Sequence, residues 1–205
     1  ELKGMGDFPN GKNIHYGIRE HAMAAINNGI ARYGLFLPFS ATFFIFSDYL
    51  KPSARIAALM GIKHFFVFTH DSIGVGEDGP THQPIEQLST FRAMPNFYTF
   101  RPADGNENAA SWQVALNLNA PSAFVLSRQG LEPLAKGEFG EVSNGAYLLS
   151  SVKEAKITFI ASGSEVSLCV KAAEILGEQG IGANIVSAPC FDLLCEQPDE
   201  YVAKI

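Results

Sequence analysis

The chain has 205 residues, enough for one ordinary domain and part of another, and its 47% share of hydrophobic residues is normal for a globular protein. The formal net charge of −6 argues against nucleic acid or an anionic membrane as a partner, although a local cluster of Arg or His could still bind a small phosphorylated molecule. No apolar run approaches the roughly 20 residues of a membrane-spanning helix, no charged-then-apolar leader opens the chain, and three scattered cysteines (Cys169, Cys190 and Cys195) indicate reduced thiols in a cytoplasmic protein.

Helical and strand-like patterns alternate from the beginning of the chain. Residues 21–33 carry apolar side chains at helical spacing and are followed by a glycine, which predicts a helix that ends there. Residues 35–42 predict a short strand, which Pro38 weakens, and residues 43–60 predict a second helix with a kink or break at Pro52. The apolar positions of the first helix are Met23, Ile26, Ile30 and Tyr33.

A dense apolar run at residues 64–69 has the length of a strand, and its composition is typical of a strand buried on both faces of a parallel sheet. A loop rich in Gly and Pro follows over residues 71–84, and a helix is expected over residues 85–94. The next expected elements are a strand at 97–100, a helix at about 106–118 and a strand at 123–126. This alternation predicts an α/β fold with a doubly wound, mostly parallel sheet and helices on both of its faces.

Residues 131–144 are rich in Gly and charged side chains and lack periodicity, which is typical of a linker. Beyond the linker the patterns predict strands at 146–152, 157–161 and 183–187 and a helix at 165–178. Ser164 stands at the expected N-cap of that helix, with the negative charge of Glu165 in its first turn. We therefore expect a first domain at residues 1–130 and a truncated second α/β domain at residues 145–205.

The loop after the apolar run contains a glycine pattern that resembles a dinucleotide-binding fingerprint. Gly74–Gly79 matches G-x-G-x-x-G and follows a predicted strand, but a dinucleotide site needs a helix to begin at the third glycine. Pro80 and Pro84 delay the helix, and Glu77 and Asp78 would set two negative charges beside a diphosphate. The context therefore argues against a dinucleotide site.

The same loop also carries a cluster of polar side chains, namely His70, Asp71, Glu77, Asp78 and His82. The cluster begins at the carboxyl end of a buried strand, which is the edge where open α/β sheets bind ligands. Three interpretations stay open. The residues are solvated loop side chains, or they hold a metal, although their spacing is unlike that of tight metal ligands, or they bind sugar hydroxyls, which both donate and accept hydrogen bonds.

Outside this loop, two single residues and one set of three aromatic residues each have both a structural and a functional interpretation. Glu20 is either an ordinary acid in the first turn of a helix or a functional carboxyl. Phe43, Phe46 and Tyr49 have a helical spacing that is usual for core residues, but the same rings could line a pocket. Arg128 follows a strand end, where an arginine often binds phosphate and where surface arginines are also common.

Taken together, these segments resemble the pyrimidine-binding domain of transketolases, in order and in spacing. The segments that carry the resemblance are Ile14–Met23, Thr42-Phe43, Thr69–Pro84, Arg101–Asp104 and Leu126–Gln129. Ile160–Val166 is similar to the start of the transketolase C-terminal domain, so the resemblance covers essentially the whole chain. The long match from His70 to Pro84 separates the chain from relatives such as deoxyxylulose phosphate synthase and pyruvate dehydrogenase.

The resemblance implies roles for the residues that bind the cofactor, thiamine diphosphate. Glu20 would hydrogen-bond the aminopyrimidine ring and so help that ring to remove the thiazolium C2 proton. Phe43, Phe46 and Tyr49 would form the aromatic pocket around the ring. Magnesium or another divalent cation would be held by a diphosphate-binding domain that this sequence does not contain.

It also implies roles for the residues that bind sugar phosphates. His70 and Arg128 would bind the phosphate, and Asp78 would accept a hydrogen bond from the C2 hydroxyl. His82 would be catalytic, lying near the reacting carbons. The activity implied is the transfer of a two-carbon ketol unit from a ketose phosphate, such as xylulose 5-phosphate, to an aldose phosphate, such as ribose 5-phosphate, in the pentose phosphate pathway.

Two alternatives remain beside this activity: a non-catalytic dimerisation or regulatory module of the same fold, and dihydroxyacetone synthase. Transketolase sites lie between the subunits of a homodimer, and the Ser, Arg and Asp that family members place just before the position of Glu1 are missing. We therefore expect the chain on its own to be inactive.

Overall fold

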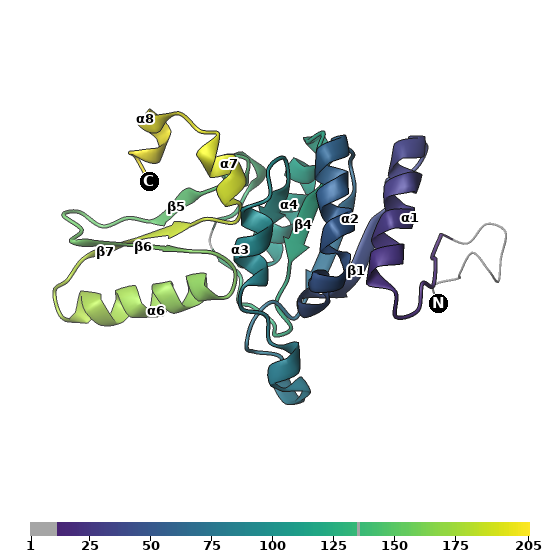
Figure 1. Cartoon of the computed structure of the whole chain (residues 1–205). Helices are drawn as coiled ribbons and strands as arrows, with labels where there is room; N and C mark the ends of the chain where they lie inside the picture. The colour runs from purple at the N-terminus through teal and green to yellow at the C-terminus, as the bar shows by residue number, and fades with distance from the viewer. Residues whose placement is uncertain (1–11, 135) are drawn as a thin grey trace.

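The computed structural model describes residues 12–134 and 136–205, which form two α/β units. The first unit, residues 12–134, is built on a four-stranded sheet in the order β1-β2-β4-β3, and every neighbouring pair of strands in it is parallel (Figure 1). The strands are β1 (Phe39–Phe43), β2 (Phe65–Thr69), β3 (Tyr98–Phe100) and β4 (Ser122–Val125). The predicted α/β class with a mostly parallel sheet is confirmed.

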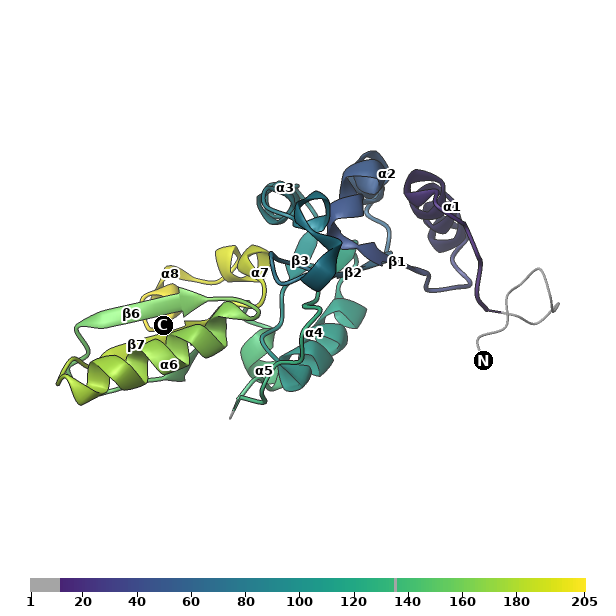
Figure 2. The same ribbon diagram turned by 90° about the horizontal axis from the view of Figure 1, so that it is seen from below.

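Helices cover both faces of this sheet, as a doubly wound fold requires (Figure 2). One face carries α1 (Glu20–Tyr33), α2 (Ser47–Met60) and α3 (Gln87–Arg92), and the other carries α4 (Gly105–Asn117). Strand β2 supplies side chains to both layers, because Phe66 and Phe68 belong to the core under α2 and α3 while Phe65 belongs to the core under α4. This confirms the expectation that the apolar run is buried on both faces.

Helix α1 turns a different face inward from the one that its large apolar residues predict. Met23 is buried, but Ile26 is 49% exposed and Tyr33 is 72% exposed. The other buried positions are Ala24, Asn27 and Asn28. Small residues let α1 lie close to α2, and the two asparagines find hydrogen-bond partners inside the unit, so polar contacts take the place of a large apolar stripe.

Several element boundaries also differ from the expected ones. Strand β1 begins only after Pro38, and a 3₁₀ turn at Phe44–Phe46 separates it from α2. Pro52 lies inside α2 without ending it. The loop between β2 and α3 contains two 3₁₀ turns, Gly76–Asp78 and Pro80–His82, which delay α3 until Gln87.

The second unit, residues 145–205, has a three-stranded sheet in the order β5-β7-β6. Strand β6 runs parallel to β7, and β5 runs antiparallel to it. Its strands are β5 (Tyr147–Ser150), β6 (Ile157–Ala161) and β7 (Ala183–Ser187), and its helices are α6 (Glu165–Glu178), α7 (Phe191–Cys195) and α8 (Asp199–Val202). Ser164 does not cap α6 with its side chain, because it already has helical backbone angles.

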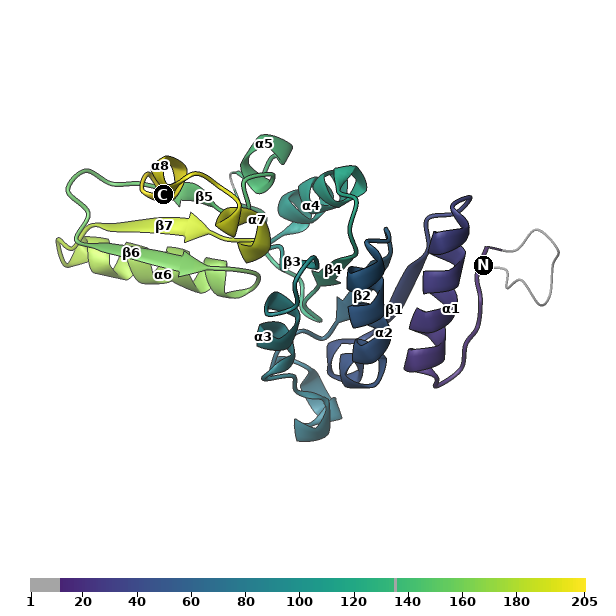
Figure 3. The same cartoon turned by 45° about the horizontal axis from the view of Figure 1, so that its top comes forward.

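The predicted linker contains a short helix, α5 (Phe139–Val142), so the absence of periodicity there was misleading. Val142 is fully buried and joins the hydrophobic cluster under α4. Residues of the second unit enter the same cluster, which therefore bridges the two units; they are Tyr147, Cys190 and Leu193. Helix α7 lies beside β3 as a result (Figure 3).

Buried polar contacts add to this junction. The carboxylate of Glu107, in the first turn of α4, accepts hydrogen bonds from the hydroxyls of Tyr147 and Ser187 and from the backbone N–H of Ala103. Burial raises the pKa of the Glu107 carboxyl, while these hydrogen bonds oppose the shift. Within the described residues, no helix has the length and apolar character needed to cross a membrane.

Candidate functional site at the carboxyl edge of the first sheet

Most of the candidate site residues gather where the parallel strands of the first unit end. Phe43 ends β1 and pairs in register with Thr69, which ends β2, so His70 follows immediately beside it. Strand β4 is paired to β2 on the other side, and Arg128 comes soon after its end. In Figure 1 the loop after β2 and the beginning of α1, where Glu20 is the first residue, lie at this same lower edge. The topology thus brings distant parts of the sequence to one edge.

The three aromatic residues form a row of rings that is partly exposed to solvent, and two histidines pack against this row. The rings of Phe43 and Phe46 are stacked, with centroids 6.0 Å apart and an angle of 7° between their planes, and Tyr49 continues the row at 6.3 Å from Phe46. His70 stacks on Phe43 at 3.7 Å, and His82 stands edge-on to Phe46 at 5.4 Å.

These aromatic side chains are not core residues. Phe43 and Phe46 are half-buried, and Tyr49 is 65% exposed. A row of partly exposed aromatic faces is an uncommon feature for a monomer surface to keep without a ligand or a partner. It offers a flat apolar surface with polar side chains at its border.

The two histidines are oriented by neighbouring threonines. Nδ1 of His70 lies 3.0 Å from Oγ1 of Thr69, and Nδ1 of His82 lies 2.9 Å from Oγ1 of Thr81. The backbone of His70 has a φ of 60°, in the left-handed region that residues other than glycine rarely adopt. No other hydrogen bond of either ring is found among the described residues, so both Nε2 atoms are available to a ligand.

The glycine-rich part of the loop lies against Arg128. A Cβ atom on Gly76 would come within 3.2 Å of the guanidinium carbon of Arg128, and Nη2 of Arg128 is 4.0 Å from the carboxylate of Glu77. The side chain of Arg128 is 45% exposed and Asp78 is exposed, so both are accessible from solvent on this rim. In the part of the chain that the structure describes, no side-chain hydrogen bond or ion pair joins Glu20 or Asp78 to another residue.

Asp71 belongs to the loop sequence but not to its solvent-facing cluster. Its side chain is 1% exposed, and its carboxylate is paired with Arg101, which comes directly after β3. Asp71 was expected to share the solvated, metal-binding or sugar-binding role of the loop cluster, and its pairing with Arg101 was not predicted. The available signal was a charged residue immediately after a strand expected to be buried, but its partner depends on how the strands are ordered.

Two further features bear on what the site can hold. Within residues 12–134 and 136–205, no three His, Cys, Asp or Glu side chains lie close enough together to share a metal ion.

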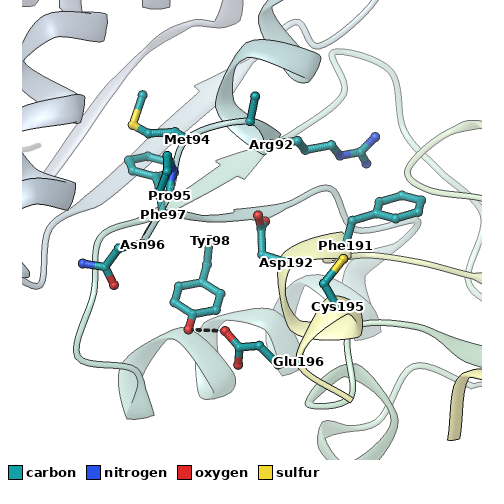
Figure 4. Close-up of a pocket in the computed structure, with 11 residues that line it drawn as sticks. Arg92, Met94, Pro95, Asn96, Phe97, Tyr98, Phe191, Asp192, Cys195 and Glu196 are labelled. Carbon is teal, nitrogen blue, oxygen red and sulfur yellow. Dashed lines mark hydrogen bonds between the residues drawn. The ribbon is translucent and has the colours of Figure 1, made fainter. Parts of the chain in front are cut away.

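A pocket of about 330 Å³ lies elsewhere, between the two units, and Figure 4 shows Tyr98 and Glu196 joined by a hydrogen bond at its border. It adjoins the amino end of β3, on the opposite side from the carboxyl edge, so we do not assign it to the candidate site.

Both units of the chain match the models of known families. The model "Transketolase, pyrimidine binding domain" matches residues 1–133, and the model "Transketolase-like TK C-terminal domain" matches residues 145–205. The chain belongs to the transketolase family, a family of transferases.

Individual relatives give the same result. The chain is 50% identical to a transketolase of Cereibacter sphaeroides over 95% of its length and 45% identical to that of Aquifex aeolicus over 100%. A crystal structure of the Campylobacter jejuni transketolase covers 98% of the chain at 72% identity with a TM-score of 0.93. A Pichia stipitis transketolase in complex with sedoheptulose 7-phosphate covers 95% at 45% identity with a TM-score of 0.92.

The chain spans about a third of these relatives. It covers 30% of the Cereibacter protein, 31% of the Aquifex protein, 32% of the Campylobacter chain and 29% of the Pichia chain.

Proposed function

We propose that the full-length protein to which this chain belongs is a transketolase that moves a two-carbon ketol unit from a ketose phosphate to an aldose phosphate in the pentose phosphate pathway. One observation carries the proposal. In a member of this family, the loop histidines His70 and His82 lie against the aromatic row of Phe43 and Phe46 at the carboxyl edge of a parallel sheet. Donors for a sugar and a surface for a flat ring are thus adjacent.

The residues present fit the pyrimidine half of thiamine diphosphate. The partly exposed aromatic row of Phe43, Phe46 and Tyr49 suits a flat heteroaromatic ring, and Glu20 begins α1 at the same edge. Bound there, the cofactor supplies the carbon nucleophile that breaks a carbon–carbon bond. The task proposed for Glu20 is to hold or share a proton at the ring nitrogen.

The sugar phosphate would lie along the rim formed by the loop and Arg128. We assign the phosphate to His70 and to the planar guanidinium of Arg128, which matches two phosphate oxygens at once. Asp78 is assigned to the C2 hydroxyl as an acceptor, and His82 to the reacting end of the sugar, where its free Nε2 can donate or accept a proton. The Pichia stipitis relative, crystallised with a seven-carbon sugar phosphate, supports this class of substrate.

The rest of the proposal concerns parts outside this chain. Magnesium or another divalent cation would be held with the diphosphate by residues elsewhere in the full-length protein, and the complete site would form between the subunits of a homodimer. We propose a cytoplasmic location, in keeping with the three free thiols of Cys169, Cys190 and Cys195. The domain division at residues 1–130, 131–144 and 145–205 is likewise proposed, and the family matches at 1–133 and 145–205 support it.

The test is ketol transfer by the full-length protein after removal of cofactor and metal. We expect xylulose 5-phosphate and ribose 5-phosphate to react only when both thiamine diphosphate and a divalent cation are restored. A panel of ketose donors separates this activity from that of dihydroxyacetone synthase. Absence of any cofactor-dependent transfer would instead favour a non-catalytic module.

A further inference from the structure

Asp71 connects the candidate substrate loop to the interior of the first unit. It directly follows His70, and its carboxylate Oδ2 accepts a hydrogen bond from Nε of Arg101 at 2.8 Å and forms an ion pair with Nη2, also at 2.8 Å. The other carboxylate oxygen, Oδ1, is buried and has no hydrogen-bond partner among the described residues. A carboxylate buried in this way depends on its one cationic partner, because an unpaired buried charge is strongly unfavourable.

The same guanidinium reaches into the second unit. Nη1 of Arg101 donates to the backbone carbonyl of Ser162 at 2.8 Å and pairs with the carboxylate of Glu165 at the start of α6. Nη2 lies 3.5 Å from the hydroxyl of Ser164. Arg101 itself is 6% exposed, so one buried side chain bonds to both units.

Gly163 makes this approach possible. Its φ is 61°, and a Cβ atom at this position would come within 2.9 Å of Cγ, Nε and Cζ of Arg101. The turn before α6 is therefore shaped around the Arg101 side chain. A purely superficial contact between two domains would not need a glycine beneath the arginine.

We propose that Arg101 is a positioning residue through which the second unit holds the substrate loop in place. The inference rests on the proposed function, since it assumes that His70 and the loop bind sugar phosphate. His70 adopts a left-handed backbone, which is unfavourable for a side chain of its type, and the ion pair of the next residue offsets that strain. Shifting Asp71 would move the His70 ring away from Phe43, where it now stacks at 3.7 Å.

The experiment compares variants of the full-length enzyme by steady-state kinetics, cofactor titration and thermal unfolding. In Arg101→Met, Asp71 loses its hydrogen bond and its ion pair. We expect KM for the sugar phosphates to rise at least about tenfold, since displacing a binding group by about 1 Å costs on the order of 100-fold. The affinity for thiamine diphosphate should stay unchanged, because Arg101 does not contact the aromatic row. In Arg101→Lys the rise in KM should be smaller than in Arg101→Met, since an ammonium group can still pair with Asp71.

Tyr98→Phe is the matched control at the same junction. It removes the 2.7 Å hydrogen bond between Tyr98 and Glu196, which joins the two units without touching the loop. We expect it to lower Tm slightly and to leave KM unchanged. Glu165→Ala keeps the ion pair between Arg101 and Asp71 but removes one anchor in the second unit, on a side chain that is 46% exposed. It should raise KM by a smaller factor than Arg101→Met. If Arg101→Met does not fold, the KM of Glu165→Ala tests the positioning role of Arg101.

Two results would overturn the inference. One is a wild-type KM in both Arg101→Met and Glu165→Ala beside a lowered Tm, which would make Arg101 a domain contact only. The other is an equal rise of KM in Tyr98→Phe, which would indicate general loosening of the junction. Loss of the proposed function is seen separately, as absence of ketol transfer in the unmodified enzyme.

Discussion

His64 is fully buried, and both of its ring nitrogens have hydrogen-bond partners at 2.8 Å. The hydroxyl of Ser40 accepts from the amide of Asn27 and lies 2.8 Å from Nε2 of His64. Nδ1–H then donates to the side-chain carbonyl of Asn28. Burial lowers the pKa of His64 to about 3, so the imidazole is neutral and its Nε2 accepts from the Ser40 hydroxyl.

This network predicts a loss of stability in acid. The unfolded chain binds a proton at His64 near pH 6.5, while the folded chain resists protonation until about pH 3. Stability from this group is therefore complete above pH 6.5 and falls as the pH is lowered towards 3, by about 1.4 kcal/mol per pH unit. In His64→Phe the slope of unfolding free energy against pH should be smaller over this window, although the variant is less stable at pH 7.

Denaturant unfolding at several values between pH 4 and 7 measures both slopes. Carboxylates titrate in the same range in both proteins, so the quantity to compare is the difference between their two slopes of unfolding free energy against pH. Equal slopes in wild type and variant would show that His64 is not held neutral by its buried partners.

Among the elements, the turn that leads into β5 is the most restricted. Gly145 has a φ of 84°, and a Cβ atom there would lie 2.2 Å from the backbone nitrogen of Leu194 and 2.4 Å from the carbonyl oxygen of Cys190. We expect Gly145→Ala to destabilise the protein by at least about 2 kcal/mol, because backbone strain and a backbone clash combine. The change in Tm of the purified variant measures this effect.

Gly177 provides the matched control within α6. A Cβ atom there would meet nothing within 4 Å. Gly177→Ala should stabilise the protein by roughly 0.5–1 kcal/mol, since alanine loses less conformational entropy in a helix. If Gly145→Ala were tolerated as well as Gly177→Ala, that result would show that α7 does not lie close to this turn.

The same elements indicate what a sequence can predict. The expected bounds of β6, α6 and β7 agree with the structure, because their apolar periodicity is a local property. The buried face of α1 and the helix α5 were not predicted, since each is determined by what it packs against. The three aromatic side chains lie side by side in the structure, but their exposure could not be inferred from spacing that is equally usual for core residues.

The candidate site shows the same division between local and tertiary information. Strand ends correctly indicated where His70 and Arg128 would lie, because parallel strands place their carboxyl ends at one edge. The pairing of Asp71 with Arg101 and Glu165 could not be predicted, since it depends on the packing of one unit against the other. Roles for individual site residues remain predictions until variants are assayed.

For the whole molecule, the chain should not bind the cofactor as the full-length enzyme does. It supplies the aromatic row but, among its described residues, no group of side chains able to hold a metal. Charge-assisted contacts to a diphosphate are the strongest that such a ligand makes. Calorimetry should therefore give a Kd for thiamine diphosphate at least about 100-fold weaker for the isolated chain than for the full-length protein. Metal-dependent binding of equal strength by the chain alone would contradict this.

We propose that this sheet edge activates the cofactor through Glu20, the first residue of α1. Its most direct test is exchange of the thiazolium C2 proton for deuterium in full-length enzyme loaded with thiamine diphosphate. Glu20→Gln keeps the shape and a hydrogen bond but cannot share a proton, so exchange should slow at least about 100-fold. Sugar-phosphate affinity should change little, because that contact is assigned to other residues. Exchange in Glu20→Gln as fast as in the wild type would contradict the account.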